Sequence, residues 1–195
     1  MLPKNSLSRV GEYYMTRPKY QEEMLRAMRE FFDRPDLAPG KQLDLGDFDT
    51  PLFNEWVTFD YVFTDGKKML EKYYEDNPHK FSLPELALYK YLQKNIYGFF
   101  KVLEVKMGMG MLLEDMMTGD EYWVVEYKGT LSTMPGFVIT NRIAQIGDDY
   151  MMVGCDVPAY NLKDYKILEK RIRTLLKHGR PNPKMIRQII SNDKL

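Results

Sequence analysis

The sequence predicts an α+β protein in which N-terminal helices precede a small, five-stranded, antiparallel, barrel-like β module and two basic C-terminal helices. Up to about residue 95, apolar residues recur at the three- and four-residue spacing of amphipathic helices. Short apolar segments separated by glycine-containing turns follow, and the helical spacing then returns. We expect a helical region over 1–97, a β module over 98–160 and a tail over 161–195, together forming one compact unit.

The N-terminal helices are predicted from their start and stop signals. The arm before residue 16 is polar, and the first helix should end near Asp33, because Pro35 disfavours helical geometry in the residue before it. Thr50-Pro51 is typical of a helix N-terminus and begins the second helix. A short third helix follows, and Ser82 with Glu85 matches the capping box at the start of a fourth.

The second helix carries the most aromatic stretch of the chain. We place Trp56 in the core and expect Trp56, Phe59 and Tyr61 to differ in burial. The reason is that helix positions three and five residues apart do not share one narrow face.

Five short segments with turns between them predict the β module. Gly108-Met109-Gly110 permits a sharp bend and lacks the third glycine and the lysine of a phosphate-binding loop. Five short strands are enough to curl into a small barrel. The strands are expected from about Phe99 to Val105 and over Met111–Glu114, Tyr122–Tyr127, Phe137–Ile146 and Tyr150–Val153.

Several motifs in residues 50–154 resemble those of a group of uncharacterised bacterial proteins. The motifs are Phe53-Asn54-Glu55-Trp56 with Phe59-Asp60-Tyr61 and Asp65-Gly66, then Leu103-Glu104-Val105, Leu113-Glu114-Asp115, Thr118-Gly119 and Arg142-Ile143. In that group a helix of the form F-x-E-W-x-x-F-D-Y precedes a β module, and many members carry a cysteine-rich zinc-binding motif of the SEC-C type. This chain lacks that motif. The resemblance implies the architecture and no particular activity.

Composition argues against several classes of protein. A single cysteine, Cys155, excludes an intramolecular disulfide and leaves no thiolate cluster for zinc. No segment approaches the ~20 apolar residues that cross a bilayer, and the first residues lack a secretory signal. We therefore expect a cytoplasmic protein with no membrane partner, no cofactor and no metal. The acidic turn of Glu114, Asp115 and Asp120 is interpreted as solvated, since it lacks the spacing of a calcium loop.

Charge is segregated along the chain. The net charge is zero, from 28 basic and 28 acidic residues, but residues 161–195 contain ten Lys or Arg and three Asp or Glu. A basic face there can neutralise phosphates, or it can solvate the tail or dock on the acidic remainder of the chain. The predicted contact residues for nucleic acid or an acidic protein partner are Lys170, Arg171, Arg173, Lys177, Arg180 and Lys184.

The leading functional hypothesis is thus a non-catalytic binding or regulatory module with a basic C-terminal surface. One alternative is an enzyme with a cleft between the helices and the β module, which uses Glu55, Asp60, Asp115 and Arg142. Another is a protein-interaction adaptor that uses exposed methionines and aromatic residues. Among the clustered methionines from residue 107 to 117, core positions are favoured and Met116 and Met117 are expected to be the most exposed.

Overall fold

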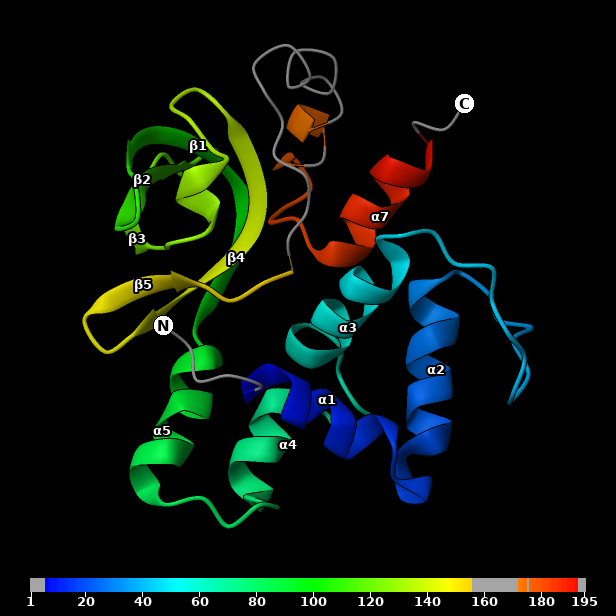
Figure 1. Cartoon of the computed structure of the whole chain (residues 1–195). Coiled ribbons are helices and arrows are strands. Elements are labelled where there is room, and N and C mark those ends of the chain that lie inside the picture. Colours follow the sequence, from blue (N-terminus) through cyan, green and yellow to red (C-terminus); the bar gives the residue numbers. More distant parts are fainter. Residues whose placement is uncertain (1–5, 156–171, 175, 193–195) are drawn as a thin grey trace. The chain divides into compact units, whose positions relative to one another are not determined.

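A computed structural model describes residues 6–155, 172–174 and 176–192 of the chain (Figure 1). They belong to two compact units. The strand unit falls within Lys94–Asn182, and the helical unit comprises Pro3–Gln93 together with Pro183–Leu195. The predicted α+β class is confirmed. The predicted first C-terminal helix lies largely outside the described residues.

The helical unit contains the predicted helices and one more. Residues Ser6–Met15, predicted as a polar arm, form an amphipathic helix that buries Val10 and Tyr14. Its apolar face is narrow, so the sequence signal for it is weak. Glu85 accepts a hydrogen bond from the Ser82 N–H at 3.0 Å, as the capping box requires. The helices are α1 (Ser6–Met15), α2 (Gln21–Phe31), α3 (Asp49–Phe59), α4 (Met69–Asp76), α5 (Leu83–Leu92) and α7 (Pro183–Asn192).

Helix α3 is the centre of the helical unit. It contacts α1, α2, α4 and α7, so most of its surface is covered. Trp56, Phe59 and Tyr61 are all buried, with at most 5% of each residue exposed. The expectation that they differ in burial is wrong for two reasons. A helix covered by several neighbours has no single buried face, and Tyr61 lies beyond the end of α3, where helical spacing no longer applies.

A polar network connects α2 to the segment after α3. The Glu23 carboxylate accepts hydrogen bonds from the hydroxyls of Tyr61 at 2.7 Å and Thr64 at 2.6 Å. It also forms an ion pair with Arg26 at 2.7 Å. Burial alone would raise the pKa of Glu23, but the hydrogen bonds from Thr64 and Tyr61 and the positive charge of Arg26 outweigh burial and lower it. The ionised form is therefore favoured by folding.

Because the pKa of Glu23 is lowered in the folded state, its stabilisation is present above the unfolded pKa and is lost as pH falls through the folded pKa. We expect Glu23→Gln to lower the free energy of unfolding by about 1.5 kcal/mol at neutral pH. The deficit should shrink as pH falls from about 6 to about 3. Urea denaturation across this range measures it. The neighbouring Glu22→Gln, whose side chain is 83% exposed, is the control and should show no such trend. A deficit for Glu23→Gln that does not change with pH would contradict the assignment.

The strand unit contains five strands joined in a ring. Each is hydrogen-bonded to two others in the order β1-β2-β3-β5-β4, and β4 returns to β1. All pairings are antiparallel except that of β3 with β5, which is parallel through Val124 and Val125. The predicted all-antiparallel arrangement is corrected at this pair. The strands are β1 (Asn95–Lys106), β2 (Gly110–Asp115), β3 (Glu121–Val125), β4 (Val138–Ile146) and β5 (Asp149–Met152).

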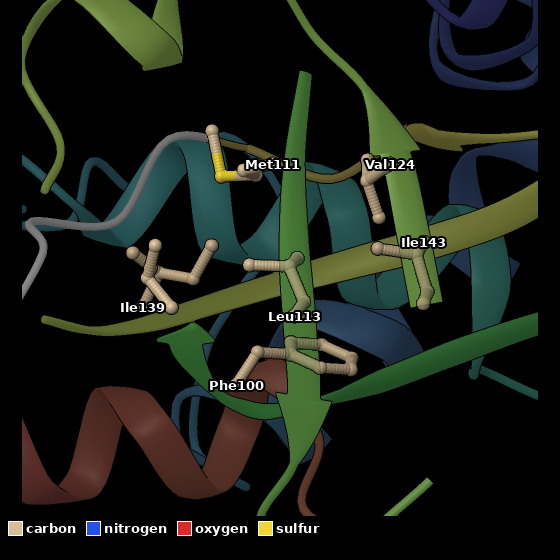
Figure 2. Close-up of a cluster of buried hydrophobic side chains, with 7 residues drawn as sticks. Phe100, Met111, Leu113, Val124, Ile139 and Ile143 are labelled. Atoms are coloured by element: carbon tan, nitrogen blue, oxygen red, sulfur yellow. The ribbon is translucent and has the colours of Figure 1, made fainter. Parts of the chain in front are cut away.

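The long strand β1 makes the ring possible. Residues Asn95–Lys101 pair with β4, and residues from Phe100 to Lys106 pair with β2. A shift in register between Val102 and Glu104 bends the strand between its two partners. The inward side chains form one apolar core, seen in Figure 2, that consists of Phe100, Val102, Met111, Leu113, Val124, Ile139 and Ile143.

Gly110, the first residue of β2, lies close to the backbone of β3. A Cβ at this position would lie 2.4 Å from the carbonyl oxygen of Val124 and 3.1 Å from the Trp123 ring. Backbone occupies the space that a side chain needs, so only glycine fits.

Gly110→Ala should therefore destabilise the protein by about 2–3 kcal/mol, the cost of an overpacked site that the backbone must shift to accommodate. The control is Gly11→Ala in α1, where the nearest atom to a new Cβ is 3.8 Å away. This control should be neutral or stabilising by about 0.5–1 kcal/mol, because alanine favours helix. Chemical denaturation of both variants decides the point. Equal stability would show that β2 and β3 separate at little cost.

Candidate functional site

The predicted basic surface is in part engaged within the chain. Lys170 and Arg171 lie outside the described residues, and Arg173 and Lys177 are exposed. Arg180 and Lys184 each form an ion pair with an aspartate of their own unit. The structure therefore gives two of the six predicted contact residues a role in the fold.

Arg180 lies at one end of the strand ring. Its guanidinium donates to Asp115 Oδ2 at 2.7 Å, and the Asp115 side chain is only 1% exposed, compared with 34% for Arg180. The other carboxylate oxygen of Asp115 accepts the Met117 N–H at 2.9 Å. A Cβ on Gly98 would lie 3.4 Å from Arg180 Nη1, which places the guanidinium against β1. Arg180 therefore neutralises a buried carboxylate at the end of β2.

The two cations that follow Arg180 in the tail anchor α7 within the helical unit. Lys184 Nζ lies 3.0 Å from Asp33 Oδ1, and its positive charge and hydrogen bond lower the pKa of Asp33. Arg187 donates to Asp49 Oδ1 at 2.7 Å, and its guanidinium carbon is 4.9 Å from the centre of the Phe32 ring. These contacts correspond to the reading in which basic residues of the tail dock on acidic residues elsewhere in the chain.

The four residues of the predicted enzymatic cleft are distributed over both units. Glu55, buried in α3, and Asp60, just after it, belong to the helical unit, whereas Asp115 and Arg142 belong to the strand unit. Asp115 is opposite Phe100 in the sheet and so points to the face of the apolar core. Arg142 is opposite Tyr97, three residues from Phe100, and so points to the other face. The structure does not bring Asp115 and Arg142 together on one surface.

The other end of β2 carries exposed apolar side chains. Met107, Met109, Tyr127 and Leu131 are 76%, 64%, 57% and 58% exposed, and we refer to these four as the methionine–tyrosine patch. Met109 and Tyr127 line a pocket of about 520 Å³, which is completed by residues that include Glu126 and, from β5, Met151 and Met152. Large apolar side chains gathered around a pocket mark a surface for binding.

Exposed methionines were predicted from the sequence, but at Met116 and Met117 rather than at Met107 and Met109. Met117 is exposed, as expected, but Met116 is only half-buried, and Met107 and Met109 are more exposed than either. Of the three methionines nearest the β1–β2 turn, only Met111 is in the core. Gly108, which has a φ of +73°, lies between Met107 and Met109, and a glycine at this position is the sequence feature that indicates the turn. It forms the tip of the turn between β1 and β2, and the residues on each side of a hairpin tip point into solvent.

The patch is chemically suited to association. Methionine side chains adapt to irregular apolar partners, and tyrosine contributes a large contact area at a small cost in entropy.

In the described part of the chain, no group of three or more His, Cys, Asp or Glu side chains is arranged to hold a metal ion. Among the helices that the structure describes, none combines the length and the apolar character that crossing a membrane requires.

The fold and this site define a two-unit α+β protein whose strand ring presents exposed apolar side chains beside the β1–β2 turn. The model of a family of unknown function (DUF7986) matches residues 46–191, and the chain belongs to this family. The matched region includes the methionine–tyrosine patch, Asp115 and Arg180. No curated protein matches the chain, and no solved structure matches it.

Arg180→Ala should lower the free energy of unfolding by about 2–3 kcal/mol, because it leaves the buried Asp115 carboxylate without its cation. Lys177→Ala, an exposed cation three residues earlier, is the control and should change stability by less than about 0.5 kcal/mol. Arg180→Ala combined with Asp115→Asn should recover part of the loss, and the coupling energy from this double-mutant cycle is the measurement. Additive effects would refute the pairing.

Proposed function

We propose that this chain is a non-catalytic protein-binding module, an interaction adaptor whose contact surface is the methionine–tyrosine patch. The observation that carries the proposal is the exposure of four large apolar side chains at the Gly110 end of β2, two of which, Met109 and Tyr127, line a pocket. Burying such side chains against a partner removes apolar area from water, at about 25 cal/mol per Å². The partner is a protein segment that inserts a large apolar side chain into the pocket.

Charge supports a protein partner over a nucleic acid. Residues 94–155, which contain all five strands, hold five Lys or Arg and eight Asp or Glu, and this excess of negative charge disfavours contact of the strands with a polyanion. Close to the patch, Lys106 lies 3.5 Å from Glu104 and 4.9 Å from the centre of the Trp123 ring. In the tail, Arg180 and Lys184 are occupied by aspartates. Among the described residues of the tail, these two predicted contact residues therefore already have acidic partners within the chain.

The number of strands supports binding by analogy. The ring has five strands, the same number as the small barrel of the oligonucleotide- and oligosaccharide-binding fold. In that fold the β1–β2 loop takes part in ligand binding, and the patch here surrounds the same loop. A shared number of strands does not specify a ligand, because function depends on the site rather than on the fold.

The experiment is a selection of displayed peptides against the full-length chain, followed by affinity measurements. Peptides should dock on the patch, and Met109→Glu should weaken their binding by about tenfold or more, the loss of one apolar anchor. Met117→Glu is the matched control, because Met117 is also exposed but follows the opposite end of β2. It should change affinity by less than about twofold.

Two outcomes would overturn the proposal. In the first, the selected peptides bind Met109→Glu as well as the unaltered chain. In the second, the chain binds labelled RNA or DNA in a salt-dependent manner, and the binding is lost in Lys177→Glu but kept in Met109→Glu. That result would restore the basic tail as the functional surface.

A further inference from the structure

We infer that Thr130 is a positioning residue that holds the β1–β2 turn in the conformation that the methionine–tyrosine patch needs. Its consequence for binding rests on the proposed function, whereas its effect on the turn does not. Thr130 belongs to the short 3-10 helix Gly129–Leu131 between β3 and β4, and it is 2% exposed. It is far from the turn in sequence and in contact with it in the structure.

One hydroxyl makes both connections. Thr130 Oγ1 accepts a hydrogen bond from the Gly108 N–H at 2.9 Å and donates one to the Tyr127 carbonyl oxygen at 2.6 Å. The first bond attaches the tip of the turn, and the second attaches the backbone of a patch residue. A buried hydroxyl that donates to one segment and accepts from the other fixes the distance between the two segments.

The contacts around Thr130 reinforce the same connection. The Tyr127 ring lies against Gly108, where a Cβ would be 3.4 Å from the ring, and the positive φ of Gly108 favours glycine at that position. Glu126 accepts the Gly129 N–H through its side chain at 3.0 Å, which closes the loop that carries Thr130. These contacts therefore hold the tip of the turn and residues 126–130 together.

These contacts fix the backbone of the turn, from which the flexible side chains of Met107 and Met109 project. Met107 and Met109 flank Gly108, and methionine has three rotatable bonds that lose freedom when a partner binds. A backbone that is already ordered removes a further entropic cost from that step. We therefore expect the Thr130 hydroxyl to increase the affinity of the patch without touching the partner.

Thr130→Val, which removes the hydroxyl at nearly constant volume, is the direct test, and Thr130→Ser, which keeps it, is the conservative variant. The matched control is Thr140→Val in β4. Thr140 is equally buried, and its hydroxyl has no hydrogen-bond partner among the residues that the structure describes. All three variants are made in the full chain with ¹³C-methyl methionine, so that the Met107 and Met109 signals report on the turn.

Hydrogen exchange at the Gly108 amide gives the first readout. In the unaltered chain this amide should exchange at least about tenfold more slowly than an unprotected one, because Thr130 accepts its hydrogen. Thr130→Val should abolish most of that protection and shift the Met107 and Met109 methyl signals. Thr130→Ser and Thr140→Val should retain the protection. An unprotected Gly108 amide in the unaltered chain would overturn the inference even if Thr130→Val does not fold.

Affinity for the peptides selected on the patch gives the second readout. Thr130→Val should weaken their binding by about threefold to tenfold, while Thr130→Ser and Thr140→Val should bind like the unaltered chain. If the selected peptides do not use the patch but Gly108 loses protection in Thr130→Val, the proposed function fails and the role of Thr130 in the turn stands. If Thr130→Val leaves Gly108 protected and the affinity unchanged, the inference about Thr130 is wrong.

Discussion

The strand unit depends on the double pairing of β1. The first half of this long strand pairs with β4 and the second half pairs with β2, and the register shift near Val102 bends the strand from one partner to the other. Once β1 is shared, the shorter strands need only meet at β3 and β5, and two parallel residue pairs suffice. The ring leaves β2 with two distinct ends, one at Gly110 and one at Asp115. The chemistry of the molecule differs sharply between them.

At the Asp115 end the chain satisfies a buried charge with its own tail. A carboxylate taken out of water is costly unless a cation and hydrogen bonds replace the solvent. Arg180 provides the cation, and the Met117 amide provides a further hydrogen bond. Lys184 and Arg187 then repeat the pairing on Asp33 and Asp49 in the helical unit. Three of the ten basic residues in the tail are thus paired with aspartates elsewhere in the chain.

Local signals in the sequence predicted most of the helices and strands, with α1 the exception, but did not predict which of them pair. The capping residues Ser82 and Glu85 and the turn glycines identify helix and strand boundaries, because these residues act on their immediate neighbours. The parallel pairing of β3 with β5 and the pairing of Arg180 with Asp115 join residues far apart in sequence, and no local spacing encodes them. The local sequence does not indicate whether a basic residue faces solvent or a buried carboxylate. The exposure of Met107 and Met109 was missed for a related reason, since composition does not distinguish a core methionine from one beside a turn.

The Gly110 end combines mobile side chains with a fixed backbone. Exposed methionines on a loose loop would collapse onto the nearest apolar surface and hide the area that a partner needs. Here Gly110 holds β2 against β3, and the hydrogen bonds of Thr130 tie the turn to residues 126–130. The backbone of this site is therefore held in place, whereas its methionine side chains can change conformation. Under the proposed function, such a surface would accept apolar side chains of different shapes from a protein segment, and the fixed position of the pocket would decide which segments fit.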